Sequence, residues 1–235
     1  MEYAGAVYHV MSRGNHSQKV FRGDEDCAMF LETLGEACGR TGWQVHAYVL
    51  MTNHVHLLLT GERASAASEL MKALGQRYVR YFNREYGRSG TLWDGRFRSC
   101  ITDTESYFLT CQRYIELNPV RAGLVAHPAR YRWSSYRANA QGEADALVQP
   151  HEVYRALGAD PASRQAAWRA MFPEEISSEV VDEIRRTANG NFVLGSPRFA
   201  DRVASTLGRR VVPGKSGRPG AKKRKTGSDH GLLRQ

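Results

Sequence analysis

Two histidines separated by one residue, His54 and His56, are the part of this sequence best suited to chemistry. The apolar residues that flank them, Val49-Leu50 and Leu57-Leu58-Leu59, indicate a buried strand rather than a helix. Side chains at positions i and i+2 of a strand leave the same face of a sheet, so both imidazoles would point the same way, as two ligands of one metal must. The alternative interpretation is a pair of half-buried strand histidines with ordinary hydrogen bonds.

A second pattern brings a phenol and an amide together. Thr102 and Glu105 fit a capping box, which predicts a helix that starts at Thr102. This helix must end near Asn118, because Pro119 disfavours helical geometry at the residue before it. Tyr114 and Asn118 are four residues apart and would share one helical face, so a phenol that can attack and an amide oxygen that can bind a hard cation would stand side by side. A core tyrosine and a C-terminal asparagine cap are the alternative.

Together these residues resemble a known family, the single-tyrosine transposases with a His-hydrophobe-His (HUH) motif, also called IS200-like. The segment Tyr-Ile-Glu-Leu-Asn-Pro-Val-Arg-Ala-Gly at 114–123 is similar to the tyrosine-helix signature of the REP-associated branch of that family. Two further stretches match the same branch, Tyr-His-Val-Met-Ser-Arg-Gly-Asn at 8–15 and Gly-Thr-Leu-Trp-Asp-Gly-Arg-Phe-Arg-Ser at 90–99. The resemblance is dense over residues 3 to 137 and thinner beyond Tyr136.

The resemblance implies a function and a site. We expect a REP-associated tyrosine transposase that cleaves and rejoins single-stranded hairpin DNA through a 5′-phosphotyrosine on Tyr114. His54, His56 and Asn118 would hold the metal. Two neutral imidazoles and one amide oxygen with open positions suit exchangeable Mg²⁺ or Mn²⁺, as the resemblance also implies, whereas structural Zn²⁺ would want thiolates or a third histidine. His9 and His46, the competing candidate ligands, are interpreted as strand histidines in or near the core.

Two other functions stay open. The first is a catalytically inactive or regulatory DNA-binding protein that keeps the same fold. The second is a metal-dependent nuclease that uses water, in which Tyr114 belongs to the core. The intact set of His54, His56, Tyr114 and Asn118 weighs against loss of catalysis. One chain could supply a complete site, or two chains could exchange their tyrosine helices, so we expect a monomer or a homodimer.

The element order predicts an α+β fold. The patterns indicate a strand at 5–12, a helix at 24–39, a hairpin of strands 43–51 and 54–60, a helix at 64–86, and a strand or extended loop at 93–101 before the tyrosine helix. This order implies a central antiparallel sheet with helices on one face. The resemblance implies the same picture, a ferredoxin-like HUH domain with the histidines on a central strand.

Three regions follow from the composition along the chain. Residues 1–137 would form the catalytic domain, and a polar, glycine-containing stretch follows it. Residues 138–208 indicate a small helical domain with helices at 150–157, 161–171, 176–188 and 197–207, which either binds DNA or is simply a small helical domain. Residues 209–235 form a basic tail whose glycines and lack of acids up to Lys225 predict flexibility.

The charge predicts a polyanionic partner. The chain of 235 residues has 33 Lys and Arg against 24 Asp and Glu, a net charge of +9. Arginines interleave with aromatic residues between 76 and 98, a combination suited to single-stranded DNA, although tyrosines at core spacing favour a structural role for some of them. The candidate DNA contacts are Arg13, Arg77, Arg80, Arg84, Trp93, Arg96, Arg98, Arg121, Arg209, Arg210, Lys215, Arg218, Lys222, Lys223, Arg224 and Lys225.

The remaining composition points to the cell interior. The four cysteines show no Cys-x-x-Cys pair and are interpreted as buried thiols of a reducing compartment. No apolar run approaches the length of a membrane span, and no secretory signal is visible at the N-terminus. We therefore expect a cytoplasmic, nucleoid-associated bacterial protein with no membrane partner.

Overall fold

The computed structural model describes residues 5–61 and 66–214, which fold around a single five-stranded sheet. The strand order across the sheet is β2-β3-β1-β4-β5, antiparallel throughout except for the parallel pair of β4 with β5. The strands are β1 (Val7–Arg13), β2 (Trp43–Met51), β3 (His54–Gly61), β4 (Arg98–Thr102) and β5 (Val193–Leu194). The mixed α+β fold predicted from the element order is thus confirmed.

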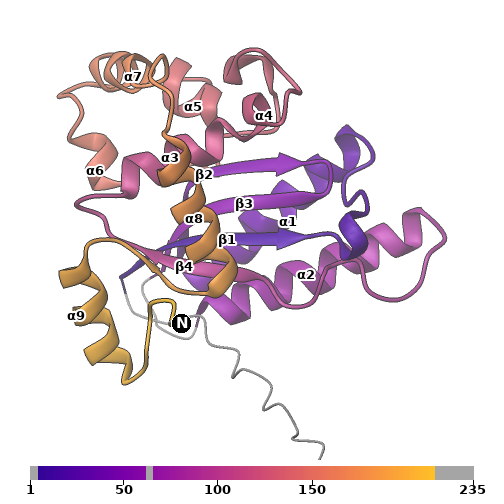
Figure 1. The fold of residues 1–235 in the computed structure, drawn as a ribbon. Helices are drawn as coiled ribbons and strands as arrows, with labels where there is room; N and C mark the ends of the chain where they lie inside the picture. Colours follow the sequence, from indigo (N-terminus) through magenta and orange to yellow (C-terminus); the bar gives the residue numbers. More distant parts are fainter. Residues whose placement is uncertain (1–4, 62–65, 215–235) are drawn as a thin grey trace, which may run out of the picture.

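Helices cover both faces of this sheet, with α8 in front of it and α1 behind it in Figure 1. The helices of the described residues are α1 (Asp24–Thr41), α2 (Ala66–Glu85), α3 (Phe108–Glu116), α4 (Asn118–Arg121), α5 (Tyr136–Gln141), α6 (Glu152–Arg155), α7 (Pro161–Ala170), α8 (Ser178–Gly190) and α9 (Pro197–Leu207). The predicted helices of the C-terminal region all occur within a few residues of their expected bounds.

The two faces of the sheet have separate hydrophobic cores. Tyr8, Val10 and Leu57 point to the core that α1 and α2 cover, whereas Val7 and Leu58 point to the core that α3, α7 and α8 cover. The expectation of helices on one face therefore holds only for α1 and α2. The reason is visible in β2, where every residue except Gln44 is buried, because a strand buried on both faces needs a cover on each.

The hairpin that carries the histidines has the predicted form. β2 ends at Met51, which pairs with His54, and Thr52 and Asn53 make the two-residue turn between them. The main chain of this turn is anchored from outside, since Gly14 N–H donates to the Asn53 carbonyl at 2.8 Å and Val20 N–H to the Thr52 carbonyl at 2.8 Å. The position of His54 at the end of β3 is therefore fixed by hydrogen bonds to the segment after β1.

The predicted capping box at Thr102 is wrong. Thr102 is the last residue of β4, is 1% exposed and pairs with Leu194 of β5. Asp103 instead organises the turn after the strand, because its Oδ1 accepts the main-chain N–H of Glu105 at 3.3 Å and α3 begins only at Phe108. Strand pairing and burial of Thr102 outweigh the local capping pattern. The partner strand β5 has only two residues and is distant in sequence, so the sequence did not reveal this pairing.

The C-terminal region packs directly on the sheet. α5 runs across the boundary expected after residue 137, β5 extends the sheet, and Ile184 of α8 lies in the same core as Leu58 of β3. The first residues of the expected tail are also ordered: Val211 is 1% exposed, and its carbonyl accepts the main-chain N–H of Val193 at 2.9 Å. The division into a catalytic domain, a C-terminal domain and a flexible tail from Arg209 stays a prediction, although Val211 packs against the core.

Two expectations drawn from composition can be compared with this fold. All four cysteines are free and buried, as expected. Within residues 5–61 and 66–214, none of the helices combines the length and the apolar character that crossing a bilayer would require.

Candidate active site

The two histidines lie on the sheet face that α3 covers. β3 is an interior strand with β2 on one side and β1 on the other, and His56 pairs with Val49 and Met11 across these strands. The ring centroids of His54 and His56 are 5.1 Å apart and their planes are perpendicular. His56 is 6% exposed and His54 is half-buried at the end of the strand. The expected common direction of the two side chains is thus observed.

The tyrosine helix brings Tyr114 to the same place. Phe108, Cys111 and Ile115 of α3 are buried in the core below it, and this apolar stripe fixes the rotation of the helix against the sheet. The ring centroid of Tyr114 lies 5.8 Å from that of His56, with the two planes close to perpendicular. Tyr114 is 4% exposed, so its ring is enclosed between α3 and the histidines of the sheet.

Asn118 completes the set at the end of the tyrosine helix. α3 ends at Glu116, Leu117 keeps helical angles, and α4 starts at Asn118. Pro119 occupies the first turn of α4, where its missing N–H costs no hydrogen bond, so the helical spacing from Tyr114 continues to Asn118. The side chain of Asn118 hydrogen-bonds that of His54. The four residues proposed from the sequence therefore converge within one chain.

Each of the two histidines hydrogen-bonds a second polar side chain through its Nδ1 atom. The Nδ1 of His54 lies 2.7 Å from Oδ1 of Asn53, and because an amide oxygen only accepts, we assign the proton to Nδ1. The Nδ1 of His56 lies 2.8 Å from Nε2 of His9 on the neighbouring strand. Each contact engages Nδ1 of the histidine, and where that nitrogen is the donor the lone pair lies on Nε2, which is the usual arrangement behind metal-bound imidazoles.

His9 also belongs to this site, although the sequence had placed it only in or near the core. It is fully buried on β1, and its ring centroid lies 5.0 Å from that of His56 and 5.9 Å from that of Tyr114. The missed signal was the period of the strand, since Val7, His9 and Met11 must share one face. His46, the other competing candidate, hydrogen-bonds Thr60 and the Gln149 carbonyl, so its interpretation as a structural histidine is confirmed.

The electrostatics of the site favour neutral imidazoles. Burial, with a smaller contribution from the positive charge of Arg13, lowers the pKa of His54 to about 4. Burial also holds the pKa of His56 well below its usual range. Neutral imidazole is the form that binds metal, so at neutral pH neither ligand has to lose a proton first. In the part of the chain that the structure describes, no three His, Cys, Asp or Glu side chains form a metal-binding group, and the Asn118 amide stays a predicted third donor.

A half-buried arginine, Arg121, faces the tyrosine. The guanidinium carbon of Arg121 lies 4.1 Å from the centroid of the Tyr114 ring, and its Nη2 donates to the Tyr114 carbonyl at 2.8 Å. The Nε and Nη1 atoms of Arg121 are buried and have no hydrogen-bond partner among the described residues. Burial lowers the pKa of this guanidinium, since it disfavours the charged form. A half-buried cation with two buried, unused donors beside Tyr114 is suited to bind an anion.

A buried carboxyl group joins the tyrosine helix to the C-terminal helices. Glu116, two residues after Tyr114, is fully buried. Its Oε1 accepts hydrogen bonds from Ser135 at 2.7 Å and Asn139 at 2.8 Å, and its Oε2 accepts one from Trp168 at 3.0 Å. Burial raises the pKa of Glu116 to about 7, while the donated hydrogen bonds oppose that shift. α5 and α7 thus hold the end of α3 that carries Tyr114.

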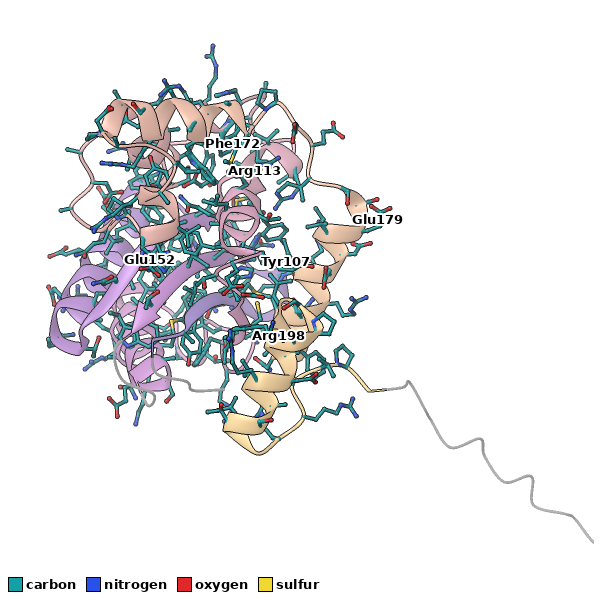
Figure 2. The ribbon with its side chains drawn as sticks, turned by 90° about the vertical axis from the view of Figure 1, so that its left-hand side faces the viewer. Tyr107, Arg113, Glu152, Phe172, Glu179 and Arg198 are labelled. Atoms are coloured by element: carbon teal, nitrogen blue, oxygen red, sulfur yellow. The ribbon has the colours of Figure 1, made fainter. Side chains whose placement is uncertain are left out.

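Tyr107, the nearest alternative tyrosine, points elsewhere. Figure 2 shows it between the sheet and α8, on which Glu179 is labelled. Its hydroxyl group donates to Oε2 of Glu183 at 3.0 Å, and it is not among the ring contacts of the histidines. Tyr107 therefore connects the start of α3 to α8.

The candidate DNA contacts fall into separate groups. Tyr78 and Phe82 are buried core residues of α2, so most aromatic residues of this segment are structural. Arg77 forms an ion pair with Glu36, whereas Arg80 and Arg84 are exposed on α2. The structure brings together Trp93, Arg96, Arg98 and Arg209 around β4, places Arg13 at the end of β1 and leaves Arg210 exposed. Lys215, Arg218, Lys222, Lys223, Arg224 and Lys225 lie outside the described residues.

Comparisons place this arrangement among known proteins. The sequence profile of the family described as "Transposase IS200 like" matches residues 2–118, which include both histidines, Tyr114 and Asn118. No curated protein sequence matches the chain.

One solved structure shares the fold. The structure of a REP-associated tyrosine transposase bound to a REP hairpin superposes with a TM-score of 0.53 at 14% sequence identity, covering 65% of this chain and 90% of that chain. A candidate transposase from Deinococcus radiodurans R1 is similar at 23% identity with a TM-score of 0.37, covering 48% of this chain and 91% of that one. The first likeness is one of fold, and it agrees with the predicted α+β architecture.

Proposed function

Since its residues 2–118 place this chain in the IS200-like transposase family, we propose that the protein is a metal-dependent tyrosine transposase that cleaves and rejoins single-stranded DNA. One observation carries the proposal. Tyr114 of α3 and Asn118 of α4 approach the His54–His56 pair from outside the sheet, so a phenol, two imidazoles and an amide meet at one point. A merely structural role for these four residues would not require their convergence.

The reaction exchanges one phosphodiester for another. The Tyr114 oxygen attacks the phosphorus atom in line, a bond from this oxygen to phosphorus forms, and the bond from phosphorus to the 3′ oxygen breaks. The products are a 5′-phosphotyrosine and a free 3′-hydroxyl group. Because no water is consumed, the energy of the phosphodiester is retained, and a 3′-hydroxyl group of another strand can reverse the step. Strand transfer requires this reversibility.

His54, His56 and the Asn118 side-chain oxygen would hold a divalent cation, Mg²⁺ or Mn²⁺. When bound, the cation draws charge from a non-bridging oxygen of the scissile phosphate. Asn53 and His9 orient the two imidazoles for this task through their hydrogen bonds at 2.7 and 2.8 Å. The neutral imidazoles and the hard amide oxygen fit such an exchangeable cation better than a structural zinc ion.

Arg121 would bind the scissile phosphate from the other side. Its two unpartnered donors are buried next to Tyr114, where a phosphate must sit when the tyrosine oxygen attacks. Charge-assisted hydrogen bonds from a fixed guanidinium stabilise the extra negative charge that develops during phosphoryl transfer. The scissile phosphate of the substrate would thus be the anionic partner of Arg121, which has none among the described residues of the free protein.

The substrate we propose is hairpin DNA with a single-stranded flank. The structurally similar REP-associated tyrosine transposase binds a REP hairpin, and a REP-like hairpin is accordingly the first substrate to try. In this chain Tyr114 faces its own histidines, which favours a complete site in one chain, whether the protein is a monomer or a homodimer. A cytoplasmic place of action near bacterial DNA belongs to the same proposal.

A covalent adduct separates this function from its alternatives. Incubation of the full chain with a 5′-flanked, labelled hairpin and Mn²⁺, followed by a denaturing gel, should give a labelled band at the mass of protein plus DNA, and EDTA should abolish it. Cleavage without an adduct would indicate a nuclease that uses water. Tight hairpin binding with neither cleavage nor adduct would indicate a DNA-binding protein that has lost catalysis.

A further inference from the structure

An apolar cavity of about 370 Å³ lies on the sheet face opposite Tyr114. Its floor consists of Phe30, Met71 and Leu74, which belong to the core under α1 and α2. The half-buried rings of Trp93 and Phe97 form its outer wall. Its volume falls in the range of about 300–1,000 Å³ that is usual for small-molecule sites in proteins.

The cavity contains one unused hydrogen-bond donor. The indole Nε1 of Trp93 is buried and has no hydrogen-bond partner among the described residues. Gly75 of α2 is the neighbour of this atom, since a Cβ atom built there would lie in van der Waals contact with Nε1, at 3.9 Å. A buried indole N–H ordinarily has a hydrogen-bond acceptor. We therefore expect the cavity to bind a flat ligand that has apolar faces and a hydrogen-bond acceptor at its edge.

A polar groove of about 950 Å³ continues from the cavity around the edge of the sheet. Ser68, Arg96 and Phe97 line both spaces, so the groove and the cavity are contiguous. The cations of the groove are Arg96, Arg98 and Arg209, against a single acid, Asp94. None of these arginines forms an ion pair within the described residues. Arg98 donates to Oδ1 of Asn189 at 3.0 Å, and Arg96 and Arg209 are exposed.

The groove leads toward the candidate active site. Met11 of β1 pairs with Arg98 of β4 on one side and with His56 of β3 on the other, so these three residues form one row across the sheet. Adjacent strands are about 4.8 Å apart, which places Arg98 about 10 Å from His56 along this row. About three nucleotides would bridge such a distance, at about 3.4 Å per nucleotide.

We propose that the cavity behind Trp93 binds one unpaired nucleobase of the DNA strand whose phosphates bind Arg96, Arg98 and Arg209 in the adjoining groove. This site rests on the proposed function, because it commits to the single-stranded flank of the same substrate. Aromatic walls and a cationic channel together favour a single strand over a lipid or an apolar peptide, whose binding would leave the three arginines without counter-charges. The indole N–H would bind an acceptor at the edge of the base.

Abasic substitution tests the site without relying on catalysis. The affinity of the full chain is measured for a set of hairpins whose flanking nucleotides are replaced one at a time by an abasic residue. We expect one position at which loss of the base weakens binding by about 5- to 150-fold, the range found when one base–aromatic contact is removed. The same set is then measured with Gly75→Leu, whose side chain would fill the cavity and which suits a helix better than glycine.

Gly75→Leu should bind the intact hairpin more weakly and show no further loss at the sensitive position. Ala73→Leu, an exposed site on the same helix that does not line the cavity, is the matched control and should keep the wild-type pattern. Absence of a sensitive position, or equal sensitivity in Gly75→Leu, overturns the proposal. Failure of the proposed function is a different result, because base recognition can be present in a protein that forms no adduct with Tyr114.

Discussion

His9 lies directly behind His56, with its Nε2 atom 2.8 Å from Nδ1 of the latter. Both rings are buried between the sheet and α3, and burial lowers the pKa of His9 to about 4, so this pair is neutral at physiological pH. In a neutral pair, one of these two nitrogens carries the proton and donates to the other, so the tautomers of the two rings determine the direction of the hydrogen bond. If His56 donates from Nδ1, its Nε2 lone pair faces the position where a cation would bind, and the contact fixes the ligand in its active form.

We expect His9→Phe to bind Mn²⁺ about 10- to 100-fold more weakly than the wild type, the usual effect of removing a group that orients a metal ligand. Isothermal titration calorimetry with Mn²⁺ measures this affinity directly. His46→Gln is the control, because His46 is equally buried on β2 but hydrogen-bonds Thr60 and not His56. Unchanged Mn²⁺ affinity in His9→Phe would mean that the pair is only a packing contact.

Tyr114→Phe should abolish the covalent adduct and leave hairpin affinity nearly unchanged, because only the attacking oxygen is removed. The matched variant is Tyr107→Phe, which removes the hydroxyl group that donates to Glu183 and should retain the adduct. Both variants are compared on a denaturing gel and by a binding titration with the same labelled hairpin. An adduct that persists in Tyr114→Phe and vanishes in Tyr107→Phe would move the nucleophile to Tyr107.

Arg121→Ala should separate catalysis from stability. Removing a donor that stabilises developing charge typically lowers kcat by about 10²–10³-fold. The folded protein without DNA should lose little stability, because Arg121 is a half-buried cation with no acidic partner in the described residues, and relief of its desolvated charge offsets the loss of its hydrogen bond to the Tyr114 carbonyl. Single-turnover cleavage and urea denaturation of the same variant provide the two measurements.

Arg113→Ala is the matched control for Arg121. Arg113 lies in α3 directly before Tyr114, but its guanidinium donates to the main-chain carbonyl of Glu174, and Figure 2 shows it beside Phe172 near the C-terminal helices. This variant should lose some stability and keep the rate of cleavage. A loss of stability without a loss of rate in Arg121→Ala would show that this arginine is structural.

The sequence was sufficient where a local period determines direction. The strand period placed His54 and His56 on one face, and the helical spacing placed Asn118 one turn after Tyr114. His9 and Arg121 needed more information. The first depends on the register between β1 and β3, which no local pattern shows. The second lies seven residues after Tyr114 and reaches it because helical angles continue past Leu117 through Pro119, whereas the sequence had predicted a helix that ends near Asn118.

Long-range pairing also explains the errors in the fold. β5 has only Val193 and Leu194, too few residues to show a period, yet it pairs with the end of β4 and determines that Thr102 is strand and not helix cap. The apolar run from Val45 to Met51 did contain the evidence that both faces of β2 are covered, because an alternating strand would have been polar on one side.

Stability should depend on pH through His46. Its pKa falls from 6.5 in the unfolded chain to about 4 in the folded protein because of burial, so protons bind the unfolded chain more tightly between these values. The contribution of neutral His46 to the free energy of unfolding is complete above pH 6.5 and is lost as the pH falls toward 4. For a single group with these pKa values, the loss between pH 7.5 and 5 is about 2 kcal/mol.

Urea denaturation of the wild type and His46→Gln at pH 7.5 and 5, without divalent cations, isolates this contribution. The other buried histidines titrate in both proteins and cancel in the difference. We expect the stability advantage of the wild type over His46→Gln to shrink by about 2 kcal/mol at the lower pH. A difference that stays constant with pH would show that His46 keeps an ordinary pKa in the folded protein.

The basic tail should contribute to DNA affinity through its charge alone. Truncation after Gly214 removes the six cations from Lys215 to Lys225 and retains Val211, whose burial makes a cut at Arg209 damaging to the core. Fewer counterions would then be released on binding, and the slope of log affinity against log salt concentration should become shallower by about 2 to 5 units. A chain that stops after Lys225 keeps all six cations and should retain the full slope.

At saturating hairpin concentration, the chain truncated after Gly214 should still form the adduct, because His54, His56, Asn118 and Tyr114 all precede the cut. Binding titrations at several salt concentrations and one adduct assay at saturation decide between the possible roles of the tail. Equal slopes for the two truncated chains would mean that the cations from Lys215 to Lys225 do not contact DNA. A lower yield of adduct at saturation would mean that the tail positions the scissile strand at Tyr114, which charge neutralisation alone does not require.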